Sequence, residues 1–299
     1  WDETRWPEQR PPTRTEIDRA SWGSVVYLSR VDVHSAAISS ALAAAVPRLR
    51  ELPGFQDALP VTRAAHHAVR EAALSTLGPT ERRRAQRVAR ATASSRGIVA
   101  FHEMAGPSVS GADDLSELLD LSRAEAGPLV TGFWGELAAE GGIETAQRIG
   151  AFAVGGDLSV DGALGSHTAC LRDPYSDVPD SRGAQYLSAE QIADHVVAAT
   201  RAGIPAGFHV IGDAGCALAL EGLERAAAIL GPEALRRSLP RLEHAEMVTD
   251  EGIAIMARLG VIASVQPMFD GLWGGEGGMY EQRLGVERTA SMNPFADLV

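Results

Sequence analysis

The feature that constrains this fold most is a regular alternation of short β-branched runs with segments rich in Ala, Leu and Arg. The alternation is clearest from Ile98 onward. It is typical of βα units built around a parallel sheet. The sequence therefore predicts an α/β fold, with strands near residues 25–28, 98–102, 129–134, 157–160, 206–211, 241–244 and 262–266. The clearest helices are expected at residues 188–202, 215–230 and 249–259, each ending at a glycine.

Composition limits the partners of the chain. With 299 residues, 45% of them apolar and 22% charged, one large domain is favoured over two small ones. A net charge of -12 argues against nucleic acid or an anionic membrane surface and favours a small-molecule ligand. The two cysteines form no CxxC motif, and no apolar run reaches the roughly 18 residues of a membrane-spanning helix. We therefore expect a cytoplasmic protein.

Two histidines end consecutive predicted strands. They are His209 in FHVIGD and His244 in LEHAEM. The carboxyl ends of the strands in a parallel α/β barrel converge on one mouth, and neutral imidazole is the commonest ligand of divalent transition metals. A single buried histidine is more often a core residue, but two at neighbouring strand ends favour metal ligation. Asp213 either orients one imidazole or caps the next helix.

Further polar side chains are expected at the same mouth. His102 and Glu103 end one predicted strand, Asp161 and His167 lie on a glycine-bounded loop, and Gln266 ends another strand. Barrel enzymes place substrate contacts at such positions, although core packing or turn formation would also explain these residues. His66, His67 and His195 fall on predicted helices, where a surface position is the simplest interpretation.

Five motifs in order give the chain a family resemblance. These motifs are FHEM, DGALGSHTA, FHVIGDAG, LEHAEM and SVQPM, at residues 101–104, 161–169, 208–215, 242–247 and 264–268. Together they resemble the amidohydrolase superfamily, and within it the amidohydrolase-3 branch, which is also called YtcJ-like and includes N-substituted formamide deformylases. The DVHSAAISSAL stretch also resembles that branch, which implies that His34 approaches the substrate pocket.

The resemblance implies a TIM-type (β/α)8 barrel with one or two divalent ions, most simply zinc. A metal-activated water would hydrolyse a C–N bond in an amide or formamide-like small molecule. His209 and His244 match the ligands on the fifth and sixth strands of the family. Asp157 stands where the family has a carboxylated lysine, so a bridging role is expected, with a strand-start residue bonded to backbone as the alternative.

The resemblance also implies that the barrel is incomplete. No His-x-His pair occurs in the sequence, and the catalytic aspartate of the eighth strand would lie beyond Val299. We therefore expect strands two to seven in residues 97–299 and an inserted helical segment in residues 1–96, packed beside the barrel. Such a fragment is expected to be metal-poor and inactive when expressed alone.

Other functional classes are less well supported. No G-x-S-x-G elbow of a serine hydrolase is present, and the one glycine-rich stretch, GGEGGM, lacks the strand and helix of a dinucleotide site. The remaining alternative is a catalytically inactive barrel that serves as a small-molecule binding or scaffold module, because a fold alone does not establish activity. A homo-oligomer is compatible with either function.

Overall fold

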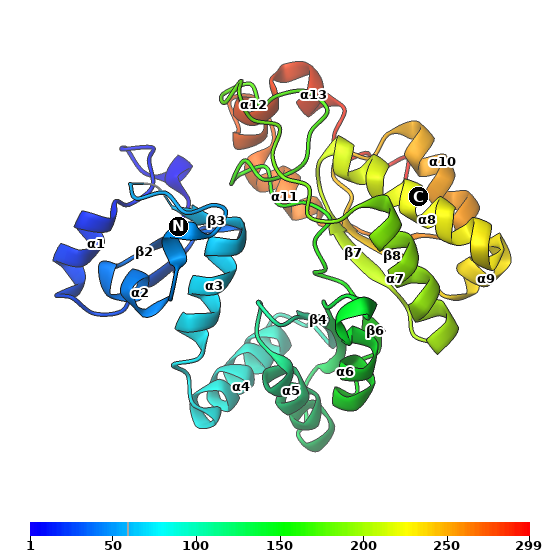
Figure 1. Cartoon of the computed structure of the whole chain (residues 1–299), viewed down its shortest axis with the longest axis horizontal. Coiled ribbons are helices and arrows are strands. Elements are labelled where there is room, and N and C mark those ends of the chain that lie inside the picture. Colours follow the sequence, from blue (N-terminus) through cyan, green and yellow to red (C-terminus); the bar gives the residue numbers. More distant parts are fainter. Residues whose placement is uncertain (59) are drawn as a thin grey trace. The chain divides into compact units, whose positions relative to one another are not determined.

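The computed structural model describes residues 1–58 and 60–299, and the chain divides into two compact units (Figure 1). Unit 1 holds residues 1–82 and 108–110, and unit 2 holds residues 83–107 and 111–299. The division lies before the expected boundary at residue 96, because the second half of α4 (Pro79–Ser95) packs on unit 2. There the buried Arg90 guanidinium donates to the backbone carbonyls of Leu121 and Glu125.

Unit 1 is built around a small antiparallel sheet. Its strands are β1 (Tyr27–Ser29), β2 (Ser35–Ile38) and β3 (Val61–Thr62), in that order across the sheet. It also contains η1 (Glu3–Arg5), α1 (Arg14–Ser21), α2 (Ser40–Ala45), η2 (Leu49–Glu51) and α3 (Arg63–Leu74). The first predicted strand thus exists, but it pairs with β2 in this antiparallel sheet and not with the parallel sheets. Short buried side chains such as Ala36 let the sheet pack closely against Val69 of α3.

Unit 2 contains the parallel strands. β4 (Ala100–Ala105), β5 (Leu129–Trp134) and β6 (Ala153–Val154) form one sheet, and β7 (Gly207–Val210), β8 (Arg241–His244) and β9 (Ile262–Ser264) form another. A parallel bridge between Val154 and Ala206 continues the strand order from β6 to β7. Helices α5, α6, α7, α8, α9 and α10 span Ala112–Ala124, Gly142–Ile149, Ala189–Ala202, Asp213–Leu230, Pro232–Arg237 and Asp250–Leu259. The predicted α/β class is confirmed.

The sheet is open at both ends. Within residues 1–58 and 60–299, no strand pairing joins β4 to β9. Apolar side chains near the open edge and at the amino ends of the strands stay exposed, with Val99 80% and Leu129 68% accessible. Burying such surface contributes about 25 cal/mol per Å². The open edge therefore forgoes stabilisation that a closed sheet would gain.

Glycines end β6 earlier than the sequence predicts. The expected strand at residues 157–160 is wrong: β6 is confined to residues 153–154, and Ser159 makes only an isolated bridge with His209. Gly155 and Gly156 follow at φ of +124° and +83°. A Cβ on Gly155 would lie 2.0 Å from the Gly207 carbonyl oxygen, so only glycine fits this crossing. Asp157 therefore follows the strand in a bend.

The main core lies between the parallel strands and the helices that cover them. Ile192 and Val196 of α7 and Leu223 of α8 pack with Phe208 of β7 in this core. Helix α7 begins with a capping box between Ser188 and Gln191 and ends at Gly203 in the left-handed conformation, as its sequence predicts. In the part of the chain that the structure describes, no helix is long and apolar enough to cross a membrane.

A second core lies beyond the carboxyl ends of β7 and β8. The segment from residue 155 to 188 has no helix or extended strand, and it packs against α11 (Pro267–Trp273), α12 (Met279–Leu284) and α13 (Val286–Ala290). Figure 1 shows this green segment beside the orange and red helices. Tyr175, Trp273 and Tyr280 provide most of its aromatic surface. The segment is therefore ordered by packing, although it lacks regular structure.

Two histidines expected at the surface are buried. His66 is 1% exposed, with Nε2 2.8 Å from the Tyr27 hydroxyl, and burial lowers its pKa to about 2. His195 is 2% exposed and fastens α7 to two other elements. Its Nδ1 accepts from the backbone N–H of Ala138, beside η3 (Ala138–Glu140), at 3.0 Å, and Nε2 faces the Val154 carbonyl at 3.4 Å. The sequence signal for His195 was its place on the apolar face of α7.

Candidate functional site

The structure brings His209 and His244 together at the carboxyl ends of β7 and β8. Their ring centroids lie 4.6 Å apart and the rings meet at 74°. Strand register pairs His209 with Glu243, so regular alternation would turn His244 toward the opposite face of the sheet. His244 and Ala245 instead adopt φ of +69° and +48°, which turns the His244 ring to the side of His209.

This left-handed turn is held in place by backbone hydrogen bonds. Ala245 N–H donates to the Val210 carbonyl at 2.9 Å and to that of Glu243 at 3.0 Å, and Met247 N–H donates to Ile211 at 3.1 Å. Two consecutive non-glycine residues at positive φ cost on the order of 1–3 kcal/mol each. A conformation of this cost persists only where its surroundings fix it. The position of the His244 ring is therefore strongly determined.

Gln266 and Phe269 contact the other sides of the His244 ring. Gln266 Oε1 lies 2.6 Å from His244 Nδ1, and the Phe269 ring stacks on the imidazole with centroids 5.9 Å apart. Both residues follow β9, Gln266 immediately before α11 and Phe269 within it. The predicted mouth residue Gln266 thus directs its carbonyl oxygen to His244.

Asp161 has a different role from the expected substrate contact. It is fully buried, and its carboxylate accepts backbone N–H groups from Cys170, Ile211 and Gly212 at 2.8–2.9 Å. Oδ1 lies 3.9 Å from His209 Nδ1. Burial raises the pKa of Asp161 to about 7, although the three N–H bonds oppose the shift. Because three backbone N–H groups bind its oxygens, Asp161 fastens the loop to the end of β7.

Asp157 is not grouped with the histidine pair. Its side chain is half-buried in the bend after β6, and its backbone carbonyl accepts from the Ser159 hydroxyl at 3.4 Å. Among residues 1–58 and 60–299, no group of three or more His, Cys, Asp or Glu side chains is placed to hold a metal ion. The structure therefore supplies two adjacent imidazole donors and no third donor beside them in this part of the chain.

His102 and Glu103 lie on opposite faces of β4, because successive strand residues alternate. His102 Nδ1 lies 3.0 Å from Arg241 Nη1 of β8, and its ring is 5.2 Å from that of Phe133. The pKa of Glu103 is raised by burial and by Asp114 of α5, so this carboxyl faces the helix side. The expectation that both residues face the mouth is wrong for Glu103.

Arg241 links several strands on the inner face of the sheet. Its guanidinium donates to Glu243 at 2.5 and 3.1 Å and to the Ser264 hydroxyl at 2.7 Å, and it lies 5.1 Å from the Phe133 ring centroid. A guanidinium only donates, so His102 Nδ1 is the acceptor and the ring proton is on Nε2. Burial and Arg241 lower the pKa of His102, which keeps it neutral. The sequence analysis missed Arg241, although its i, i+2 spacing to Glu243 was visible.

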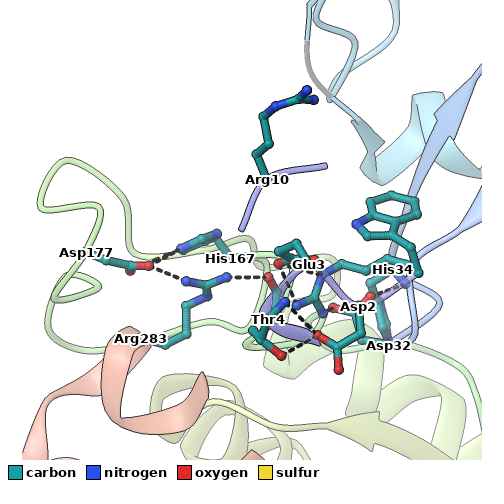
Figure 2. A network of polar contacts seen from close by, with 12 residues as sticks. Asp2, Glu3, Thr4, Arg10, Asp32, His34, His167, Asp177 and Arg283 are labelled. Carbon is teal, nitrogen blue, oxygen red and sulfur yellow. Dashed lines mark hydrogen bonds and ion pairs between the residues drawn. The ribbon is translucent and has the colours of Figure 1, made fainter. Parts of the chain in front are cut away.

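His167 and His34 lie in different units. His167, at φ +54° in unit 2, places Nε2 3.0 Å from Asp177, which also pairs with Arg283 of α12 (Figure 2). His34, in unit 1, donates its backbone N–H to Asp32 at 3.2 Å (Figure 2). Within unit 2, His167 does not form a metal-binding group with His209 and His244. His34 belongs to unit 1.

Glu246 is a buried carboxyl that the sequence analysis did not single out. It is 4% exposed, and Oε2 has no hydrogen-bond partner among the described residues. Burial raises its pKa to about 7, partly offset by the Tyr280 hydroxyl. Its only sequence signal was a charged residue two positions after His244 in LEHAEM.

Comparison with known proteins gives matches along the whole chain. A model described as amidohydrolase family matches residues 1–299. The Bacillus subtilis (strain 168) protein named "Putative amidohydrolase YtcJ" is 34% identical over 112 residues, which cover 38% of this chain and 20% of that protein. "Protein LONG AFTER FAR-RED 3" of Arabidopsis thaliana is 32% identical over 108 residues, or 36% of this chain and 18% of that protein.

Two solved structures share the fold. Both are uncharacterized metal-dependent hydrolases, and both alignments cover 100% of this chain. The Pyrococcus furiosus protein gives a TM-score of 0.66 at 24% identity, with 60% of its length covered. The Pyrococcus horikoshii OT3 protein gives 0.69 at 22% identity, with 58% covered. The chain thus spans about three fifths of the length of these solved relatives.

Proposed function

We propose, because this chain belongs to the amidohydrolase family, that it is part of a metal-dependent hydrolase acting on a C–N bond of an amide or formamide-like small molecule. The observation that carries the proposal is the pair of imidazoles at neighbouring strand ends, 4.6 Å apart between centroids. The order of parallel strands from β4 to β9 supports the further proposal that the open sheet is part of a (β/α)8 barrel.

The donors fit a divalent metal ion such as zinc. Imidazole nitrogens suit zinc, and a catalytic zinc site takes three protein ligands and leaves one position open. His209 and His244 would supply two of these ligands. Asp157 is the proposed carboxylate of the set, and its side chain would have to turn from the bend after β6 toward the pair. The site would hold two ions if Asp157 bridges them, and one ion if it does not.

The metal, when bound, would supply a Lewis acid that lowers the pKa of water toward about 7 and polarises a carbonyl. The residues of the chain would orient the substrate. His102 is the best-supported contact, because Arg241 fixes its proton on Nε2, from which it can donate to a carbonyl oxygen. His167 and His34 are further proposed contacts from the loop after β6 and from unit 1.

The test is metal content and turnover of the full-length protein. We expect a stoichiometric divalent ion and release of amine from a panel of amides and N-substituted formamides. His209→Asn and His244→Asn should each lose the metal and the activity while keeping the circular dichroism spectrum. His67→Gln, an exposed histidine of unit 1, is the matched control and should keep both.

Unchanged metal content in both histidine variants would overturn the proposed site. A folded protein that binds a small molecule, but neither holds metal nor releases amine, would favour the binding-module alternative over the enzyme.

A further inference from the structure

The structure assigns Gln266 as a positioning residue that selects the tautomer of His244 and leaves its Nε2 as the metal-binding nitrogen. This inference rests on the proposed function, because Nε2 of His244 acts as a ligand only if a metal binds. The hydrogen-bond pattern that supports it does not require a metal.

The orientation of the Gln266 amide follows from its second partner. Gln266 Nε2 donates to the Ser264 backbone carbonyl at 3.1 Å. A carbonyl oxygen only accepts, so the amide nitrogen must be on that side. Oε1 is then the atom that lies 2.6 Å from His244 Nδ1.

The tautomer of His244 follows from the same reasoning. An amide oxygen only accepts, so Nδ1 must carry the proton that it donates to Gln266. In neutral imidazole the other nitrogen then holds the lone pair. Nε2 of His244 is therefore the only ring nitrogen able to bind a metal while this hydrogen bond exists.

The surroundings also fix the angle of the ring. Phe269 stacks on the imidazole at 23°, and the His209 ring meets it edge-on at 74°. These contacts and the left-handed turn at His244 and Ala245 fix the orientation of the ring. The hydrogen bond to Gln266 then determines which ring nitrogen is protonated. Partners of this kind typically contribute 10–100-fold to metal affinity.

Nitrogen-15 NMR of the full-length, metal-free protein, labelled in histidine, tests the tautomer directly at a pH where His244 is neutral. We expect Nδ1–H in the wild type, a shift toward Nε2–H in Gln266→Leu, and Nδ1–H again in Gln266→Glu, which keeps an acceptor for Nδ1 although it loses the donor to Ser264. His244→Asn assigns the signal. Gln282→Leu, an exposed glutamine of α12, is the matched control and should leave the signal unchanged.

Zinc affinity of the same proteins, measured by chelator competition, gives the second readout. We expect roughly 10–100-fold weaker binding in Gln266→Leu and near-native binding in Gln266→Glu. An Nε2–H tautomer in the wild type, or an unchanged tautomer in Gln266→Leu, would overturn the inference. If the wild type does not bind zinc, the proposed function fails. The NMR result then still tests whether Gln266 selects the tautomer of His244.

Discussion

The ends of β7 and β8 differ from the end of β6 in how far backbone pairing extends. β7 and β8 remain paired up to Val210 and His244, and the left-handed turn at His244 and Ala245 brings the His244 ring to the side of His209. β6 stops at Val154, and Gly155 and Gly156 turn the chain away before Asp157. His209 and His244 are thus part of paired strands, whereas Asp157 lies in the bend between β6 and the bridge at Ser159.

The segment after β6 is joined to β7 by two backbone hydrogen bonds, from Val160 N–H to the His209 carbonyl at 2.9 Å and from His209 N–H to the Leu158 carbonyl at 3.1 Å, and by side-chain anchors. Asp161 binds backbone N–H groups at the end of β7, and His195 binds Val154 from α7. These two contacts tie the segment and β6 to the sheet that carries the histidines. Changes at β6 and in this segment should therefore affect the stability of the fold, whereas changes at His209 and His244 should affect metal binding.

Gly155→Ala should have the largest effect. The new Cβ would collide with the Gly207 carbonyl at 2.0 Å and would be held at φ +124°. We expect a loss of about 4 kcal/mol or more in the free energy of unfolding, measured in denaturant. Gly203→Ala is the control, since Gly203 is also at positive φ, +72°, in the left-handed α region, with no atom within 4 Å of its Cβ. It should lose about 1–2 kcal/mol, and equal losses would contradict the close crossing.

This crossing explains why the sequence predicted β5 and β8 at their observed bounds but misplaced β6. Both β5 and β8 are apolar or alternating runs bounded by turn residues, and such patterns are local. The expected strand at 157–160 is also a local pattern. Its failure comes from Gly155 meeting Gly207, a contact between segments about fifty residues apart that no local pattern contains.

Asp161→Asn should have the next largest effect. Oδ2 accepts two backbone N–H groups, from Cys170 and Gly212. An amide NH₂ at that position is itself a donor, so it could not accept from either of them. We expect a loss of about 3 kcal/mol in unfolding free energy, because buried donors left unpaired cost about 1–3 kcal/mol each. Asp213→Asn is the control: Oδ1 accepts the backbone N–H of Arg172 at 3.0 Å, which one amide oxygen can still do. A stable Asp161→Asn protein would contradict the anchoring role.

The site itself was predictable in part. Two histidines at consecutive strand ends are a pattern in the sequence, and the structure places their rings together. The roles of Glu103 and Asp161 were not predictable in the same way. The face of Glu103 depends on the exact register of β4, and the partners of Asp161 lie up to 51 residues away along the chain.

Metal affinity should separate the two regions in the full-length protein. We expect His209→Asn to weaken zinc binding about 100-fold, which corresponds to about 2.7 kcal/mol, because it removes a donor that the paired strand holds in place. Asp157→Asn should weaken binding less than about tenfold, because no pairing directs that carboxylate to the imidazoles. Chelator competition at one fixed pH gives both values. Equal losses would show that Asp157 binds the metal as strongly as His209, which would contradict the expected difference between the two strand ends.

A pH dependence of stability is also expected at the anchor between α7 and β6. Burial lowers the pKa of His195 to about 4, below the value of about 6.5 in an unfolded chain. Between these values the unfolded state binds more protons, so the contribution of His195 to stability is present above pH 6.5 and is lost as the pH falls toward 4. The slope approaches about 1.4 kcal/mol per pH unit.

Unfolding free energies of the wild type and His195→Gln between pH 7 and pH 4.5 test this. The variant should be less stable at pH 7, since Ala138 N–H loses an acceptor, and the difference should shrink as the pH falls. A constant difference between wild type and His195→Gln would mean that His195 titrates normally.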